Sequence, residues 1–242
     1  LGLNEIYNEF SSGNQDVGAI RNMVKYVYDN ASSEEQRLKY LCLFGDGSYD
    51  YKDRITNNTN IVPSWYSYNS FSVATSYVSD DFYGMMDQNE GTMLTSDKLD
   101  IAVGRMLADT PQRAKELVDK VESYYIKEAF GSWRNNFVVV SDDVDQDWEG
   151  ILQGTTDEIG NLVNDKKPFI NVVKIHSDSF EQQSSAGGDR YPAVNTEISN
   201  AVDKGALVLN YFGHGGEDGL AEERILLKPD INDFRNICKL NC

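Results

Sequence analysis

The chain has 242 residues, 40% of them hydrophobic, and its 22 Lys plus Arg against 39 Asp plus Glu give a net charge of −17. This length can bury a sizeable core as one large or two smaller domains. Such an acidic surface repels nucleic-acid phosphates and anionic lipid headgroups. The composition therefore argues against nucleic-acid binding and against membrane docking by charge alone.

The first half of the chain alternates helical and strand patterns. Apolar residues at helical spacing predict a helix over 17–28, with Asp16 as its cap. Apolar runs predict strands over 38–44 and 97–105, and Thr110 before a proline predicts the start of the next helix.

A long polar and aromatic segment, residues 49–79, lies between these strands and is expected to form a surface loop. Its aromatic side chains either form a substrate or partner surface or pack the loop against the core. They are Trp65, Tyr66, Tyr68 and Tyr77.

The second half repeats the alternation after Gly131, which we expect to separate a first half, 1–130, from a second half, 131–242. A flexible loop is expected over 184–189. The alternation predicts a mainly parallel α/β sheet with helices on both faces. Strands are predicted at 136–141, 170–175 and 206–209, and helices at 150–162, 193–202 and 229–235.

Five carboxylates follow the predicted strand 136–141 within eight residues. Clustered oxygens of this kind can hold a calcium ion, although the spacing is not that of an EF-hand. A solvated acidic loop is the alternative. The residues are Asp142, Asp143, Asp145, Asp147 and Glu149, and the candidate calcium ligands are Asp145 and Asp147.

The richest stretch for chemistry is 206–218, where a short apolar run leads into Gly213-His214-Gly215-Gly216. The run predicts a strand buried on both faces, and the glycines allow a sharp turn that presents an imidazole at its carboxyl end. Binding sites of open α/β sheets lie at that end of the strands. The other histidine, His176, is expected to be structural.

Residues 210–216, Asn-Tyr-Phe-Gly-His-Gly-Gly, resemble the histidine motif of the gingipain family of cysteine peptidases. Four further segments carry the resemblance in the same order along the chain, at 8–12, 43–51, 79–84 and 99–105. The resemblance implies a caspase-like three-layer sandwich with two related halves. Among its members the chain is most similar to the sortases of the type IX secretion system.

In this family a histidine acts as the base for a cysteine, so the resemblance assigns the base to His214. It implies that the N–H groups of Gly215 and Gly216 stabilise the oxyanion. An acidic residue is expected to orient the imidazole; Asp142 and Asp143 are the candidates, and the resemblance favours Asp143.

The nucleophile is not evident among the three cysteines. Cys42 lies in an apolar run and is expected to pack as a small hydrophobic residue. In the family the thiol follows the strand after the helix beyond the histidine, which would place it past Cys242. We therefore expect a chain truncated before the nucleophile strand, with Cys242 as the alternative nucleophile and Cys238 preceding that strand.

The resemblance implies a surface-exposed protein of the outer membrane, although no signal peptide opens this sequence. It implies cleavage of the C-terminal signal of secreted cargo and transfer of the cargo to an amine of anionic lipopolysaccharide or to water. The β-barrel shuttle PorV would be a partner, and no cofactor would be required. A non-catalytic α/β binding module is the alternative. A nucleotide-binding domain is disfavoured, because this sequence lacks the glycine motifs of such domains.

Overall fold

The fold is that of a computed structural model, which describes residues 1–69, 71–72, 75–94 and 96–235. Two compact units, Leu1–Val118 and Asp119–Cys242, divide the chain within helix α3 (Pro111–Tyr125). The sequence pattern suggested a division at Gly131, and the division between the two units lies upstream of that residue. Each unit has its own sheet and its own hydrophobic core.

The first unit is built on a parallel pair of strands, β1 (Tyr40–Phe44) and β4 (Ala102–Met106). Helices α1 (Leu3–Phe10) and α2 (Val17–Asp29) pack together and cover one face of this pair. Leu43 belongs to the core that they form, so the amphipathic pattern of α2 is explained by burial against the sheet.

Local details of the first unit confirm two expected helix starts. The Asp16 carboxylate accepts the N–H of Gly18 at 2.7 Å and caps α2. Thr110 Oγ1 accepts the N–H of Arg113 at 3.2 Å at the start of α3. The expectation for Cys42 is wrong: it is exposed, because side chains alternate along β1 and Leu43 takes the buried side.

The aromatic segment closes into a short antiparallel pair, β2 (Trp65–Tyr66) and β3 (Val78–Ser79). Trp65 is buried and stacks on Phe82, with ring centroids 6.2 Å apart. Tyr68 and Tyr77 contact Trp65 from outside and stay exposed. The aromatic side chains therefore divide between packing and surface.

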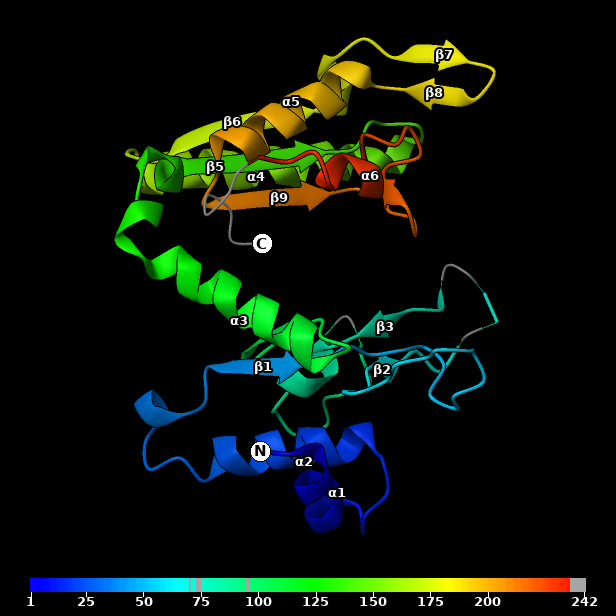
Figure 1. Cartoon of the computed structure of the whole chain (residues 1–242), viewed down its shortest axis with the longest axis vertical. Coiled ribbons are helices and arrows are strands. Elements are labelled where there is room, and N and C mark those ends of the chain that lie inside the picture. The colour runs from blue at the N-terminus through cyan, green and yellow to red at the C-terminus, as the bar shows by residue number, and fades with distance from the viewer. Residues whose placement is uncertain (70, 73–74, 95, 236–242) are drawn as a thin grey trace. The chain divides into compact units, whose positions relative to one another are not determined.

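The second unit contains a fully parallel sheet in the order β6-β5-β9, as Figure 1 shows. Its strands are β5 (Asn136–Ser141), β6 (Asn171–His176) and β9 (Val208–Phe212). Within the described residues β9 is an edge strand whose ends are exposed, so the expectation of a strand buried on both faces is wrong.

Helices lie on both faces of this sheet. Val138 and Val140 of β5 belong to a core with α5 (Pro192–Lys204). Val139 points to the opposite face, where a Cβ on Gly160 of α4 (Gly150–Lys166) would lie 3.6 Å from its side chain. The second unit is thus an α/β/α sandwich, and the predicted α/β class with a mainly parallel sheet is confirmed.

Several elements differ from the sequence expectations. The loop at 184–189 is a hairpin of β7 (Gln183–Ser185) and β8 (Gly188–Arg190). Helix α1 was not predicted, and α6 (Lys228–Ile231) is shorter than expected. Two short strands, β10 (Gly219–Leu220) and β11 (Leu226–Leu227), pair beyond the His214 turn. Among the helices of the described residues, none combines the length and apolar character needed to cross a bilayer.

Candidate active site

His214 follows strand β9 and lies at the carboxyl end of the parallel sheet. Gly213 allows the chain to pass close to Asp142 and Tyr211. A Cβ at this position would lie 2.6 Å from Cβ of Asp142 and would also meet the Tyr211 hydroxyl. The His214 side chain is 44% exposed, so a reacting group can approach it from solvent.

Asp142 holds the imidazole. It follows β5, whose parallel register pairs Ser141 with Phe212 and so brings the ends of the two strands together. Its side chain is 2% exposed, and Oδ2 accepts the His214 backbone N–H at 2.8 Å and lies 2.9 Å from His214 Nδ1. A carboxylate in this position keeps the proton on Nδ1 and leaves Nε2 available to accept one.

Tyr211 braces the same turn. Its hydroxyl donates to the His214 carbonyl oxygen at 2.6 Å and lies 3.4 Å from Asp142 Oδ2. Burial, and then the negative charge of Asp142, raise the pKa of Tyr211, so the phenol keeps its proton and remains a donor.

Glu149 approaches the other ring nitrogen, a contact that the sequence analysis did not anticipate. Its carboxylate is buried; Oε2 accepts the N–H groups of Asp145 and Gln146 at 2.8 Å each, and Oε1 lies 3.6 Å from His214 Nε2. The Trp148 ring meets the imidazole edge-on at 6.0 Å between centroids. The approach depends on the 3₁₀ turn Asp147–Glu149, which sequence spacing does not reveal.

These carboxylates raise the pKa of His214 above its ordinary value. Partial burial opposes the charged form, but the hydrogen bond and charge of Asp142, followed by the charges of Glu149 and Glu222, outweigh it. The surroundings therefore stabilise the imidazolium relative to a free histidine, and the imidazolium is the form that pairs with a thiolate in cysteine enzymes.

Asp143, which the resemblance favoured as the orienting acid, does not make the contact with the imidazole. Its Oδ2 accepts the Tyr191 hydroxyl at 3.1 Å and lies 3.4 Å from the Gln182 amide. Both residues follow the end of β5, but only the Asp142 side chain contacts the imidazole, whereas that of Asp143 contacts Tyr191.

Asp143 instead joins Asp142 and Glu223 in a buried trio, with one oxygen of each lying within 4.8 Å of the others. Burial, and then the charges of Asp143, Asp145 and Asp142, raise the pKa of Glu223 to about 7. Burial also raises the pKa of Asp143. Around neutral pH the Glu223 carboxyl is therefore close to the midpoint of its titration.

Replacing Glu223 by Gln should stabilise the fold at alkaline pH. A carboxyl whose pKa is raised by folding makes folding less favourable as the pH rises from its unfolded value to about 7. We expect Glu223→Gln to gain roughly 1–3 kcal/mol at pH 8 and almost nothing below pH ~5. Urea unfolding at both pH values measures this. The exposed neighbour Glu222→Gln is the control, and equal effects at both pH values would contradict the expectation.

The two candidate calcium ligands, Asp145 and Asp147, are exposed and lie outside the trio. Asp145 contributes its backbone N–H to Glu149. The calcium expectation thus gains no support from the described geometry and stays a prediction that a Ca²⁺ titration would check.

The two glycines after His214 differ in what they can donate. Gly216 N–H donates to the Gly219 carbonyl at 2.9 Å and is committed in this structure, so it is a poor oxyanion donor. Gly215 N–H has no acceptor among the described residues, and a Cβ at Gly215 would meet nothing within 4 Å. Gly215 is the stronger of the two oxyanion candidates.

The remaining candidates lie away from this group. His176 is buried, with Nδ1 2.8 Å from Ser141 Oγ, in keeping with a structural role. Cys238 and Cys242 lie outside the described residues. Cys42 belongs to the first unit.

Comparison with known proteins identifies the family of this chain. The model of Peptidase family C25 matches residues 2–242. The RgpB pro- and mature-domain complex of Porphyromonas gingivalis matches 96% of the chain with 18% identity and a TM-score of 0.60. The Arg-specific cysteine proteinase gingipain R matches 96% with 19% identity and a TM-score of 0.56. Dimeric latent PorU from Porphyromonas gingivalis matches 54% with 30% identity and a TM-score of 0.42.

No curated protein sequence matches the chain. The chain spans 46% of the RgpB complex chain, 45% of the gingipain R chain and 13% of the PorU chain. The family model nonetheless covers almost every residue, including both strands that carry Asp142 and His214. The chain belongs to Peptidase family C25, the gingipain family of cysteine peptidases.

Proposed function

We propose that this chain supplies the general base and its orienting acid for a cysteine peptidase. The observation that carries the proposal is the Asp142–His214 pair at the carboxyl end of the parallel sheet, with Nδ1 2.9 Å from the carboxylate and the ring exposed to solvent. Membership of Peptidase family C25 gives the pair its chemical context.

In the proposed reaction His214 Nε2 takes the proton of a cysteine thiol, and the thiolate attacks the scissile carbonyl carbon. Asp142 stabilises the resulting imidazolium, and Gly215 N–H donates to the oxyanion. Collapse of the tetrahedral intermediate breaks the C–N bond, and the imidazolium returns its proton to the leaving amine. The product is an acyl-enzyme thioester.

The acyl-enzyme has two fates. Water gives hydrolysis, and an amine gives transfer of the acyl group with a new amide bond. The sequence resemblance to type IX secretion sortases favours transfer: removal of a C-terminal signal domain from secreted cargo and linkage of the new carboxyl end to an amine of anionic lipopolysaccharide. That resemblance also supports a cell-surface location at the outer membrane, with PorV as partner, and a reaction that needs no cofactor.

The test uses the full-length natural protein with a purified cargo protein that carries a C-terminal signal domain, with and without a small primary amine. Mass spectrometry should detect a cargo carboxylate without the amine and an amide adduct with it, and iodoacetamide should abolish both. Cargo that binds without forming either product would favour the non-catalytic binding module instead.

The same assay addresses the nucleophile. We expect Cys242→Ala to leave both products in place, in line with a thiol positioned elsewhere in the full-length protein. Loss of both products in folded Cys242→Ala protein would make Cys242 the nucleophile.

A further inference from the structure

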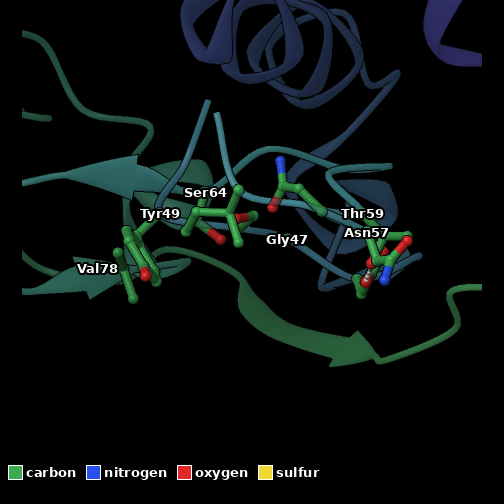
Figure 2. Close-up of a pocket in the computed structure, with 10 residues that line it drawn as sticks. Gly47, Tyr49, Asn57, Thr59, Ser64 and Val78 are labelled. Carbon is green, nitrogen blue, oxygen red and sulfur yellow. Dashed lines mark hydrogen bonds between the residues drawn. The ribbon is translucent and has the colours of Figure 1, made fainter. Parts of the chain in front are cut away.

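The first unit contains a polar cavity that the proposed peptidase chemistry does not use. It has a volume of ≈ 480 Å³ and lies where β1 ends, around the turn that begins with Asp46. Figure 2 shows Tyr49 and Ser64 on one side of it and Asn57 and Thr59 on the other. The carboxyl ends of parallel strands are where α/β folds usually bind ligands.

Asp46 is fixed in this cavity by its backbone. Its N–H donates to Ala108 O at 3.1 Å, and its carbonyl accepts the N–H groups of Ile61 and Val62 at 3.1 and 2.9 Å. The following Gly47 is packed so closely that a Cβ would lie 3.0 Å from the Val62 carbonyl oxygen. The backbone that carries the Asp46 carboxylate is therefore held by these contacts.

The Asp46 carboxylate is only half satisfied. Oδ2 accepts the hydroxyl of Thr59, but Oδ1 is buried and has no hydrogen-bond partner among the described residues. A buried acceptor without a donor destabilises the fold, and more so when it carries charge. A donor brought in by a ligand would remove this destabilisation.

The nearest cation of the fold cannot supply this donor. Arg105 uses its five N–H groups on the Asp80 carboxylate, on Ser64 Oγ and on the carbonyl oxygens of Gly45 and Val62, at 2.7–3.1 Å. Asp46 has no ion pair within the part of the chain that the structure describes. Arg105 therefore acts on the Asp46 carboxylate only as a nearby charge and does not donate a hydrogen bond to it.

The other lining residues indicate the chemistry of a ligand that would suit this cavity. Hydroxyl and amide groups surround Asp46, while Ile55, Val78 and the ring of Tyr49 add apolar surface. Among the described lining residues Asp46 is the only carboxylate, whereas calcium prefers six to eight oxygens with several carboxylates. A single ammonium group has three donors and suits one carboxylate with neutral acceptors around it, and an aliphatic stem suits the apolar side.

We propose that this cavity of the first unit binds a primary ammonium group on an aliphatic stem, the chemistry of a lysine side chain, with Asp46 as its counter-ion. The site is separate from the Asp142–His214 pair, which belongs to the other unit.

The test is a ¹H–¹⁵N NMR titration of the 242-residue chain with Nα-acetyl-lysine N-methylamide. The amide signals of Gly47 and Ser48, next to Asp46, should shift with saturation. The same compound acetylated on Nε should bind roughly tenfold or more weakly, because it lacks the charged donor. Asp46→Asn should weaken binding of the free amine by a similar factor.

The matched control is Asp53→Asn, which removes one charge from the same loop at an exposed residue whose positive φ also suits Asn. It should leave the affinity within about twofold. Equal affinity for the free and acetylated compounds would overturn the proposal without relying on any variant. So would shifts caused by Ca²⁺ but not by the amine. His214→Ala should not alter binding, so this result and the peptidase proposal can fail separately.

Discussion

His214→Ala in the full-length natural protein should lower kcat by about 10²–10⁴-fold, the usual contribution of a positioned general base. The fold should survive, because the ring is 44% exposed and, among the described residues, its polar side-chain contacts are those with Asp142 and Glu149. Peptide cleavage and thermal unfolding measured on the same sample separate the two effects.

Chemical rescue sharpens this experiment. Exogenous imidazole should restore part of the activity of His214→Ala, since it can occupy the vacated space next to Asp142 and accept the thiol proton. The exposed Glu217→Ala in the same loop is the control and should retain activity. Turnover close to wild type in His214→Ala would contradict the assignment of the base.

The parallel sheet of the second unit could be predicted because its strands are strongly apolar and bounded by helix starts. Residues 136–141 were predicted as the strand that forms β5, and the caps at Asp16 and Thr110 were read directly from local residue types. Strand β9 lies two residues later than the most apolar stretch, because its pairing with β5 rather than hydropathy fixes where it begins. The hairpin β7–β8 was not predicted because its strands lack apolar alternation, and α1 was not predicted because it is short.

The candidate site could be predicted only in part, because several of its contacts depend on tertiary structure. The ends of parallel strands meet at one edge, so an aspartate after β5 was expected near a histidine after β9. Which of Asp142 and Asp143 faces the imidazole depends on the direction of each side chain, which spacing does not encode. Glu149 and Glu223 reach the group through a 3₁₀ turn and a distant loop, and both contacts are tertiary.

Glu149 and Asp142 act on opposite nitrogens of one ring and should be separable by experiment. Glu149 lies 3.6 Å from Nε2, without an orienting bond to the ring, while Asp142 contacts Nδ1. Glu149→Gln should therefore lower the pKa of His214 but leave the ring in place. Its loss of kcat should be much smaller than that of Asp142→Asn.

Asp142→Asn should be nearly as damaging as loss of the histidine, lowering kcat by up to about 10⁴-fold. Asparagine keeps the size and can still accept the His214 backbone N–H, so the turn should persist. It removes the charge that favours the imidazolium and leaves only a neutral, weaker acceptor opposite Nδ1. The pKa of His214 should then fall toward its ordinary value near 6.5.

The sign of the pH effect follows from the raised pKa of wild-type His214. The folding stability contributed by the Asp142–His214 pair is fully present below the unfolded-state pKa of His214, near 6.5, and is lost as the pH rises through the higher folded-state value. For activity, the alkaline limb of kcat/KM reports loss of the imidazolium, so it should move to lower pH in Asp142→Asn. The chain has only two histidines, so imidazole NMR can follow His214 with His176 as an internal reference. An unchanged His214 pKa together with an unchanged alkaline limb in folded Asp142→Asn protein would show that Asp142 does not orient the base.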